Sequence, residues 1–249
     1  NYATAGWILK ANIGKSFRVP IPKELGTDGV NYHIFRYEKG NPNLNPEESY
    51  QLDAGIHWGN DRLTIQFDPY LNYFPNYIYM NPTPNYYEGL QWYYYTQSRV
   101  IRCGFELQAD WKILPSLSAE FKGEYLYAEQ LSGEKKGYTL PFSTPWSADA
   151  TLRYAFCRKN VGNEGFVAIN MHVTGRQNNI VPPEKPTPGY YTLNLTAGKD
   201  FAFGERTLRL SLNAENLLNR KYYDHTSFYR LIDVPEPGRN VALMATFEF

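Results

Sequence analysis

Apolar and polar residues alternate along most of this chain with a period of two. The clearest stretch is the last one, where every second residue is apolar to the end of the chain, at Val241, Leu243, Ala245, Phe247 and Phe249. Successive side chains of a β-strand point to opposite faces, so this period is typical of a strand with one apolar face. We therefore predict a terminal strand that continues to the last residue.

Nine earlier stretches show the same alternation, and short polar turns and longer loops connect them. The predicted strands cover residues 7–14, 50–58, 63–72, 105–111, 117–125, 150–156, 167–173, 191–197, 208–215 and 241–249. Short turns are predicted at 59–62, 114–116, 159–163 and 203–205, and long loops at 20–46, 86–95, 132–145 and 182–188, with one more before Gly238. Because short and long connections alternate, all the short turns lie at one end of the strands.

The composition leaves few ways to cross a membrane. Of the 249 residues, 43% are hydrophobic, 16% aromatic and 20% charged, and no apolar run approaches the roughly 20 residues of a spanning helix. In lipid, a chain satisfies its backbone hydrogen bonds only as a helix or a closed barrel. The alternation therefore predicts an all-β fold, a transmembrane antiparallel β-barrel of about ten strands, with short turns in the periplasm and long loops outside.

Aromatic residues gather at the short-turn ends of the predicted strands. Those that face outward by their place in the alternation are Trp7, Trp58, Trp111, Phe156, Phe203 and Phe249. Aromatic side chains are enriched where a barrel meets the membrane–water boundary. They predict one aromatic girdle, and outer-membrane lipid as the partner of the outward face.

Charge and cysteine content narrow the function classes. The 25 Lys and Arg residues balance the 25 Asp and Glu residues, giving a formal net charge of +0. No overall field attracts nucleic acid, so nucleic acid is not a predicted partner. Cys103 and Cys157 lie in separate predicted strands without metal-ligand spacing. Two unpaired thiols are the favoured interpretation, and a disulfide stays open.

The inward positions carry many charged residues. They are Lys10, Asp53, His57, Asp68, Glu106, Asp110, Glu120, Lys122, Glu124, Arg153, His172, Arg209, Glu215 and Glu248. Such residues commonly bond to neighbouring strands and to whatever fills the lumen. An Asp–His combination also suits acid–base catalysis, as in the ten-stranded omptin-type surface proteases, and a passive porin would share the alternation. The sequence contains no Gly-rich phosphate loop, Ser–His–Asp spacing or Cys/His zinc cluster, so we predict neither an enzyme nor a cofactor.

The most specific motif precedes the last strand. It reads Asn216-Leu217-Leu218-Asn219-x-x-Tyr222, and after a loop Gly238-Arg239 opens the strand that ends at Phe249. In order and spacing these elements resemble the carboxyl-terminal segment of the TonB-dependent outer-membrane receptors of Gram-negative bacteria. Several elements agree at once, which makes this resemblance more specific than one short motif.

The resemblance implies a larger molecule. Receptors of this family have a barrel of about 22 strands, preceded by a plug domain and a TonB-contacting box. Residues 1–249 would then be a single domain, roughly the second half of the barrel, with the plug absent. The implied partners are the TonB complex of the inner membrane, the plug, the missing strands and a metal-complex ligand. The implied location is the cell outer membrane.

The loop after the first strand resembles paired boxes described for haem receptors. Phe17-Arg18-Val19-Pro20 and Asn41-Pro42-Asn43-Leu44 form the two boxes. Val19 stands where Ala is usual, and both boxes recur in siderophore and zinc receptors, so they identify the family better than the cargo. Because Pro fixes φ and Asn bonds to nearby backbone, the second box is also compatible with a structural clamp at the rim.

Candidate ligand-binding residues follow from the loops. They are His33, Tyr32, Tyr37 and Glu38 between the two boxes, and His225 in the last loop. An imidazole with adjacent phenols suits haem iron, and with a carboxylate it suits zinc. The family resemblance implies a receptor that imports a scarce metal complex, namely a ferric siderophore, haem or zinc, and cobalamin or a glycan stays open as the cargo. A loop histidine that only bonds to its neighbours remains the alternative for His33.

Overall fold

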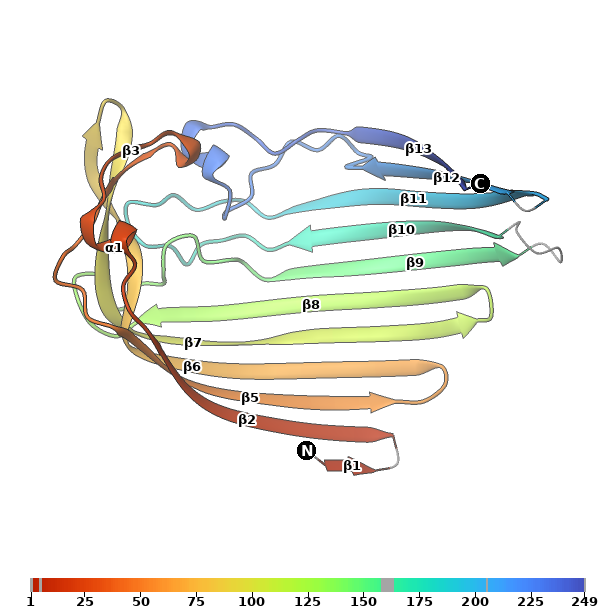
Figure 1. Cartoon of the computed structure of the whole chain (residues 1–249), viewed down its shortest axis with the longest axis horizontal. Coiled ribbons are helices and arrows are strands. Elements are labelled where there is room, and N and C mark those ends of the chain that lie inside the picture. The colour runs from red at the N-terminus through yellow and green to blue at the C-terminus, as the bar shows by residue number, and fades with distance from the viewer. Residues whose placement is uncertain (1, 5, 158–163, 205, 249) are drawn as a thin grey trace.

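The computed structural model describes residues 2–4, 6–157, 164–204 and 206–248. Within them, thirteen strands form one sheet, in the order β1-β2-β5-β6-β7-β8-β9-β10-β11-β12-β13, with β3 and β4 to one side (Figure 1). The strands are β1 (Tyr2–Thr4), β2 (Trp7–Arg18), β3 (Asp28–Asn31), β4 (Arg36–Lys39), β5 (Glu47–Gly59), β6 (Leu63–Tyr87), β7 (Leu90–Leu114), β8 (Leu117–Gln130), β9 (Ser147–Cys157), β10 (Glu164–Thr174), β11 (Tyr190–Phe203), β12 (Arg206–Glu215) and β13 (Asn240–Glu248). Three short helices, α1 (Pro22–Gly26), η1 (Tyr32–Ile34) and η2 (Phe228–Ile232), lie in the long connections.

Each of the ten predicted strands is confirmed, as β2 and β5 to β13. Neighbours along the sheet are antiparallel, and β1 and β13 stand at its two ends. Figure 1 shows the long connections gathered at one end, which we call the loop end, and the short turns at the other, the turn end. The sheet curves but does not close, as expected for part of a larger barrel. The predicted turn at 159–163 lies outside the described residues.

The hairpin of β6 and β7 corrects one prediction. The sequence predicted a loop at 86–95, but both strands continue past the others and are joined by Glu88 and Gly89 alone. These two residues have φ values of 50° and 81°, the left-handed pair that a two-residue hairpin turn needs. The register shifts between Phe74 and Tyr77 and between Pro82 and Tyr86. The first shift places one extra residue in β6 and so reverses the faces that its later side chains take, whereas the second places two extra residues there and keeps the faces. No single alternation therefore runs through β6.

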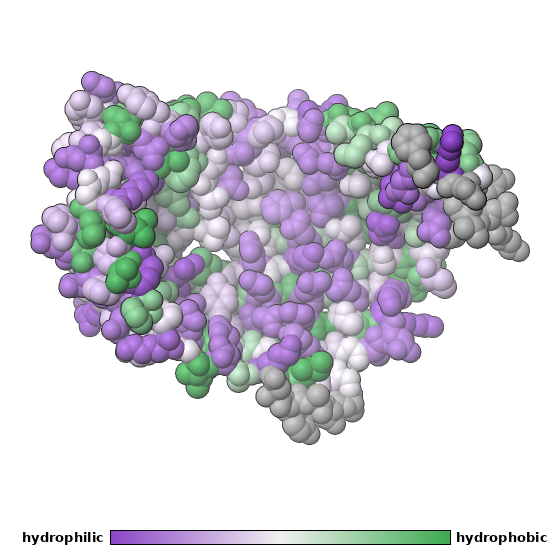
Figure 2. All heavy atoms as spheres, in the orientation of Figure 1, coloured by the Kyte–Doolittle hydropathy of each residue, from purple (hydrophilic) through white to green (hydrophobic). Residues whose placement is uncertain are grey.

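The outward face of the sheet is apolar and exposed. Leu52, Leu152, Val167 and Leu243 keep 41% to 75% of their surface accessible, and contiguous exposed apolar surface of this kind marks a membrane or protein contact. On the face seen in Figure 2, by contrast, hydrophilic residues gather over the middle of the strands. Among the described residues, no helix combines the length and the apolar character needed to cross a membrane.

Aromatic residues of the predicted girdle occupy the turn end. Trp7 and Trp58 are register partners on β2 and β5, with ring centroids 6.2 Å apart. Trp111 and Phe203 are 50% and 60% exposed. Phe249 lies outside the described residues. Cys103, on β7, has a free thiol.

The buried core lies at the loop end, not in the middle of the sheet. It comprises Phe74, Tyr79, Val100, Ala128 and Leu140, from β6, β7, β8 and the connection after β8. Elsewhere the wall is a single layer, so its side chains pack only against neighbours on the same face. The loop end therefore resembles a small globular domain placed on a thin wall.

Gly104 on β7 tests this packing. A methyl group there would overlap the backbone oxygen of Tyr125 and lie 2.6 Å from the Tyr70 hydroxyl. We expect Gly104→Ala to lower the stability of the barrel by about 1–3 kcal/mol through overpacking, measured as the thermal midpoint of the heat-modifiable band. Gly14→Ala on β2 is the matched control, because its nearest neighbour would lie 3.7 Å away. Equal midpoints for the two variants would contradict the packing described.

Candidate functional site

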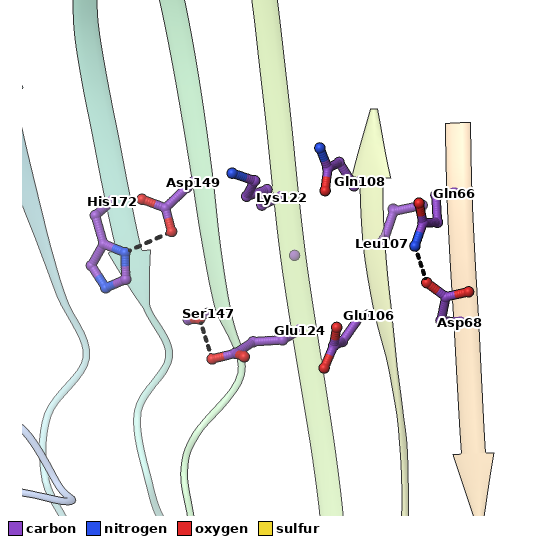
Figure 3. Close-up of a pocket in the computed structure, with 11 residues that line it drawn as sticks. Gln66, Asp68, Glu106, Leu107, Gln108, Lys122, Glu124, Ser147, Asp149 and His172 are labelled. Carbon is purple, nitrogen blue, oxygen red and sulfur yellow. Dashed lines mark hydrogen bonds and ion pairs between the residues drawn. The ribbon is translucent and has the colours of Figure 1, made fainter. Parts of the chain in front are cut away.

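The lumen face of the sheet carries a polar hollow of about 330 Å³, lined by residues of five consecutive strands, β6 to β10 (Figure 3). We define the lumen face as the side that carries Asp68, Glu106, Glu124, Asp149 and His172, all of which line this hollow. Asp68, Glu106, Glu124 and His172 were predicted to face inward, and Asp149 on β9 is the register partner of His172. The hollow confirms that they share one side of the wall.

Two histidines of the lumen face bond to carboxylates on adjacent strands. His172 Nδ1 lies 3.0 Å from Asp149 Oδ2, and His57 Nε2 lies 3.0 Å from Asp68 Oδ1. His172 Nε2 also lies 2.9 Å from the Thr174 hydroxyl. A carboxylate, an imidazole and a hydroxyl in series resemble hydrolase chemistry, but Thr174 is 8% exposed and pairs with Tyr190 in the sheet ladder. The Thr174 hydroxyl is thus part of the sheet packing and is largely covered from a substrate.

One like-charged pair on the lumen face stands out. Glu106 on β7 and Glu124 on β8 are direct register partners, and Figure 3 shows both side chains on the same side of the wall. Ser147 donates a hydrogen bond of 2.7 Å to Glu124. Like charges directly opposite one another destabilise a strand pair. A cation placed between them from the lumen would remove that repulsion.

The first long connection, residues 19–46, is folded against the rim. Strand β4 pairs in parallel with β7, from Arg36 beside Gln91 to Lys39 beside Tyr94. Arg18 of the first box bonds to Glu24 at 2.8 Å and to Glu47 at 3.1 Å. This ion-pair network ties α1 to the ends of β2 and β5.

The second box forms a tight turn. The Asn41 side chain accepts a hydrogen bond of 3.0 Å from the backbone N–H of Asn43. The Gln97 side chain on β7 bonds to both backbone groups of Asn45, at 2.8 Å each. Leu44 is 9% exposed. These contacts give the box a structural role at the rim, as Asn and Pro chemistry predicts.

The carboxyl-terminal motif closes the last long connection. Asn216, in a left-handed conformation, bonds to the backbone of Arg220 at 2.8 and 2.9 Å. Asn219 Oδ1 accepts a hydrogen bond of 2.9 Å from the backbone N–H of Arg239. A methyl group at Gly238 would lie 2.8 Å from the same oxygen, so a larger residue there would collide with it. Tyr222 stacks on Tyr190 with ring centroids 4.1 Å apart. The motif thus holds the end of β12 next to the start of β13.

The predicted ligand residues of the first loop fall into different environments. Tyr32 is 73% exposed, and His33 beside it in η1 is also exposed. Tyr37 donates a hydrogen bond of 2.6 Å to Asp28, and its ring stacks on Trp92. His33 and Tyr32 therefore face solvent together, whereas Tyr37 belongs to an aromatic stack.

Glu38 is engaged in ion pairs. Its side chain is 2% exposed and lies 2.7 Å from Lys23 and 2.9 Å from Arg36. Burial opposes its ionisation, but the hydrogen bond from Lys23 and the charge of Arg36 outweigh burial and lower the pKa of Glu38. Within residues 2–4, 6–157, 164–204 and 206–248, the structure brings no three His, Cys, Asp or Glu side chains together as a metal site.

His225 lies in a buried polar cluster. Its Nδ1 is 2.9 Å from the Thr187 hydroxyl, and its Nε2 is 4.0 Å from Glu184 Oε2. Burial lowers the pKa of His225 to about 4, aided by the charge of Arg230, so the imidazole is neutral at pH 7. Its side chain is 1% exposed, and in this structure it is covered from solvent.

Glu184 joins three long connections. It accepts hydrogen bonds from the backbone N–H of Phe142, at 3.1 Å, and from Arg230, at 3.4 Å. Arg230 also lies over the Phe142 ring, and burial raises the pKa of Glu184 above its usual range. Sequence analysis missed this cluster. Its members come from three separate loops, and no local pattern marks a glutamate that becomes buried only when those loops meet.

The chain resembles known proteins in sequence and in structure. The family model described as TonB dependent receptor-like, beta-barrel, matches residues 1–217. The copper transporter OprC superposes with a TM-score of 0.76 at 20% identity, over 96% of this chain and 37% of its own. The ferric preacinetobactin receptor BauA from Acinetobacter baumannii gives 0.69 at 14%, over 99% and 35%, and the FrpB iron transporter from Neisseria meningitidis 0.66 at 15%, over 96% and 36%. The chain spans little more than a third of these proteins, and at these identities the likeness concerns the fold.

Glu184→Ala tests the loop cluster. The change removes the acceptor of the Phe142 N–H and leaves the Arg230 guanidinium buried without its carboxylate, which costs about 3–5 kcal/mol in buried pairs. We expect faster amide exchange in residues 131–146, 175–189 and 216–239, with the strands unchanged, by hydrogen exchange and mass spectrometry.

The control for this measurement is Lys185→Ala. Lys185 is exposed and follows Glu184 directly, so its removal leaves the buried cluster intact. If amide exchange in these three connections is equally fast in both variants, Glu184 does not hold the connections together.

Proposed function

The chain belongs to the TonB-dependent receptor family, and from that premise we propose that the protein containing it is an outer-membrane receptor that imports a scarce metal complex with energy delivered through TonB. The family match over residues 1–217 carries this proposal. It is supported by a wall that is apolar toward one side and charged toward the other, as a lipid-facing barrel with a polar lumen requires. Family members are transporters and receptors, so the protein is proposed to act without catalysis.

Proteins of similar structure favour metal as the cargo. They include a copper transporter, a ferric preacinetobactin receptor and an iron transporter. We propose a ferric siderophore, haem or zinc for this protein, captured by the loop end. Exposed aromatic residues there, including Tyr32 and Tyr86 at 73% and 65%, would pack against a planar chelator.

We further propose that a plug domain from the remainder of the receptor fills the lumen, and that additional strands complete the barrel between β13 and β1. An unpaired backbone group in lipid costs several kcal/mol, so neither end of the sheet is stable alone in a bilayer. The repulsion between Glu106 and Glu124 supports a lumen occupant that supplies a cation at that level. Arginine would suit this role, because its planar donors can reach two carboxylates.

His33 is proposed as the metal-facing residue of the first loop. In cells starved separately of iron and zinc, we expect His33→Ala in the full receptor to reduce growth at least tenfold on one source among haem, ferric siderophore and zinc. Loss on haem alone selects haem, and loss on zinc alone selects zinc. Lys136→Ala, an exposed change in another loop, should grow as wild type. Unimpaired growth of His33→Ala on every source would remove His33 from the site and leave siderophore import as the function.

The paired change Glu106→Gln and Glu124→Gln tests the lumen occupant. In a receptor with its plug deleted, the change relieves repulsion and should raise the thermal midpoint of the barrel, by an amount equivalent to about 0.2–1 kcal/mol. In the full receptor it removes the partners of the plug cation and should lower the midpoint of plug release. A shift in the same direction in both proteins would count against a cation from the plug.

A further inference from the structure

Arg153 on β9 is a cation of the lumen face that pairs with no carboxylate of the described residues. It lies four residues after Asp149 on the same strand, so the two side chains point to the same side. Its guanidinium carbon lies 3.5 Å from the centre of the Phe166 ring on β10. Across residues 2–4, 6–157, 164–204 and 206–248, Arg153 forms no ion pair, whereas Arg209, which lines the same hollow, bonds to Asp200 at 2.9 and 3.0 Å.

The Phe166 ring beneath Arg153 has room because its neighbour on β11 is a glycine. Phe166 and Gly198 are register partners on β10 and β11. A methyl group at Gly198 would lie 2.7 Å from the Phe166 ring, so the ring lies flat over the space that a side chain would occupy. A guanidinium stacked on such a ring keeps its N–H edges free, and it loses little freedom when those edges form hydrogen bonds.

Beside this stack the wall is hollowed. A space of about 630 Å³ is lined by Arg153, Phe166, Gly198, Asp200, Arg209 and Ser211, among others. Its lining residues on β9, β10 and β11 lie near the turn end of those strands. The space is large enough for several side chains. Glu164 also lines it, and among its described lining residues Arg209 is paired with Asp200, whereas Arg153 forms no ion pair.

We propose that Arg153, stacked on Phe166, anchors a carboxylate side chain of the receptor segment that fills the lumen. The proposal rests on the proposed function, since it needs a plug from the same receptor. Charge complementarity selects a carboxylate, whose two oxygens match the guanidinium fork. The length of receptor outside this chain supplies the occupant, because the chain spans only 37% of a similar structure.

The anchor acts together with the acidic pair higher on the wall. Glu106 and Glu124 attract a cation of the occupant, and Arg153 attracts an anion nearer the turn end. Opposite charges at two levels define the orientation of the occupant, because the reverse orientation would oppose like charges at both levels.

Hydrogen exchange on the full receptor tests the anchor. We expect Arg153→Ala to accelerate exchange in one stretch of the plug about tenfold or more, as loss of a charged hydrogen bond does, with barrel strands unchanged. Arg153→Lys keeps the charge without the planar fork, and should show a smaller acceleration. Arg206→Ala is the control, because Arg206 is exposed near the same turn end but has the outward parity of Leu208 and Leu210. Plug exchange in Arg153→Ala equal to that of wild type would overturn the proposal.

A photoreactive residue in place of Ser211, which lines the same hollow, identifies the occupant directly. Cross-linking to an Asp- or Glu-containing peptide of the same receptor supports the anchor, and cross-linking to lipid, to another protein or to the metal complex overturns it. Failure of the proposed function would appear separately, as a receptor deletion that grows normally on every limiting metal source.

Discussion

Every strand of this sheet depends on its neighbours for backbone hydrogen bonds, because a bilayer supplies none. That requirement fixes the antiparallel order and sets the wall at one layer. A single layer has no interior, so side chains meet lipid on one face and the lumen on the other. The exposed Leu and Val side chains and the charged lumen residues are therefore two results of the same constraint.

At the loop end the backbone does not depend on neighbouring strands in this way, since water can also accept and donate hydrogen bonds there. The connections pack as a globular protein does, with the small core around Val100 and buried ion pairs at Glu38 and Glu184. These pairs are stable because hydrogen bonds offset the cost of burying charge. The wall positions the loops, and the loops hold one another, so the loop end and the wall rest on separate packing.

The lumen face combines both situations. Its polar residues are open to whatever occupies the lumen, yet each is held by strand register. His57 and His172 find carboxylates on adjacent strands, whereas Glu106, Glu124 and Arg153 keep charge that the wall does not neutralise. Under the proposed function, these three charged side chains are where a partner inside the lumen would bind.

The sequence by itself determined the ten main strands, because a period of two follows from strand geometry and needs no knowledge of neighbours. It also located the Asn216 motif and the boxes around Arg18 and Asn41, since turn residues act on adjacent backbone. It did not show β1, the short strand at one edge of the sheet. Only the tertiary structure decided the continuation of β6 and β7, where the register shift between Phe74 and Tyr77 breaks the alternation of β6. The tertiary structure alone showed that Glu184 pairs with Arg230. It also showed that the Phe166 ring lies beneath Arg153. Those contacts depend on register and on loops converging in space, and no local pattern encodes either.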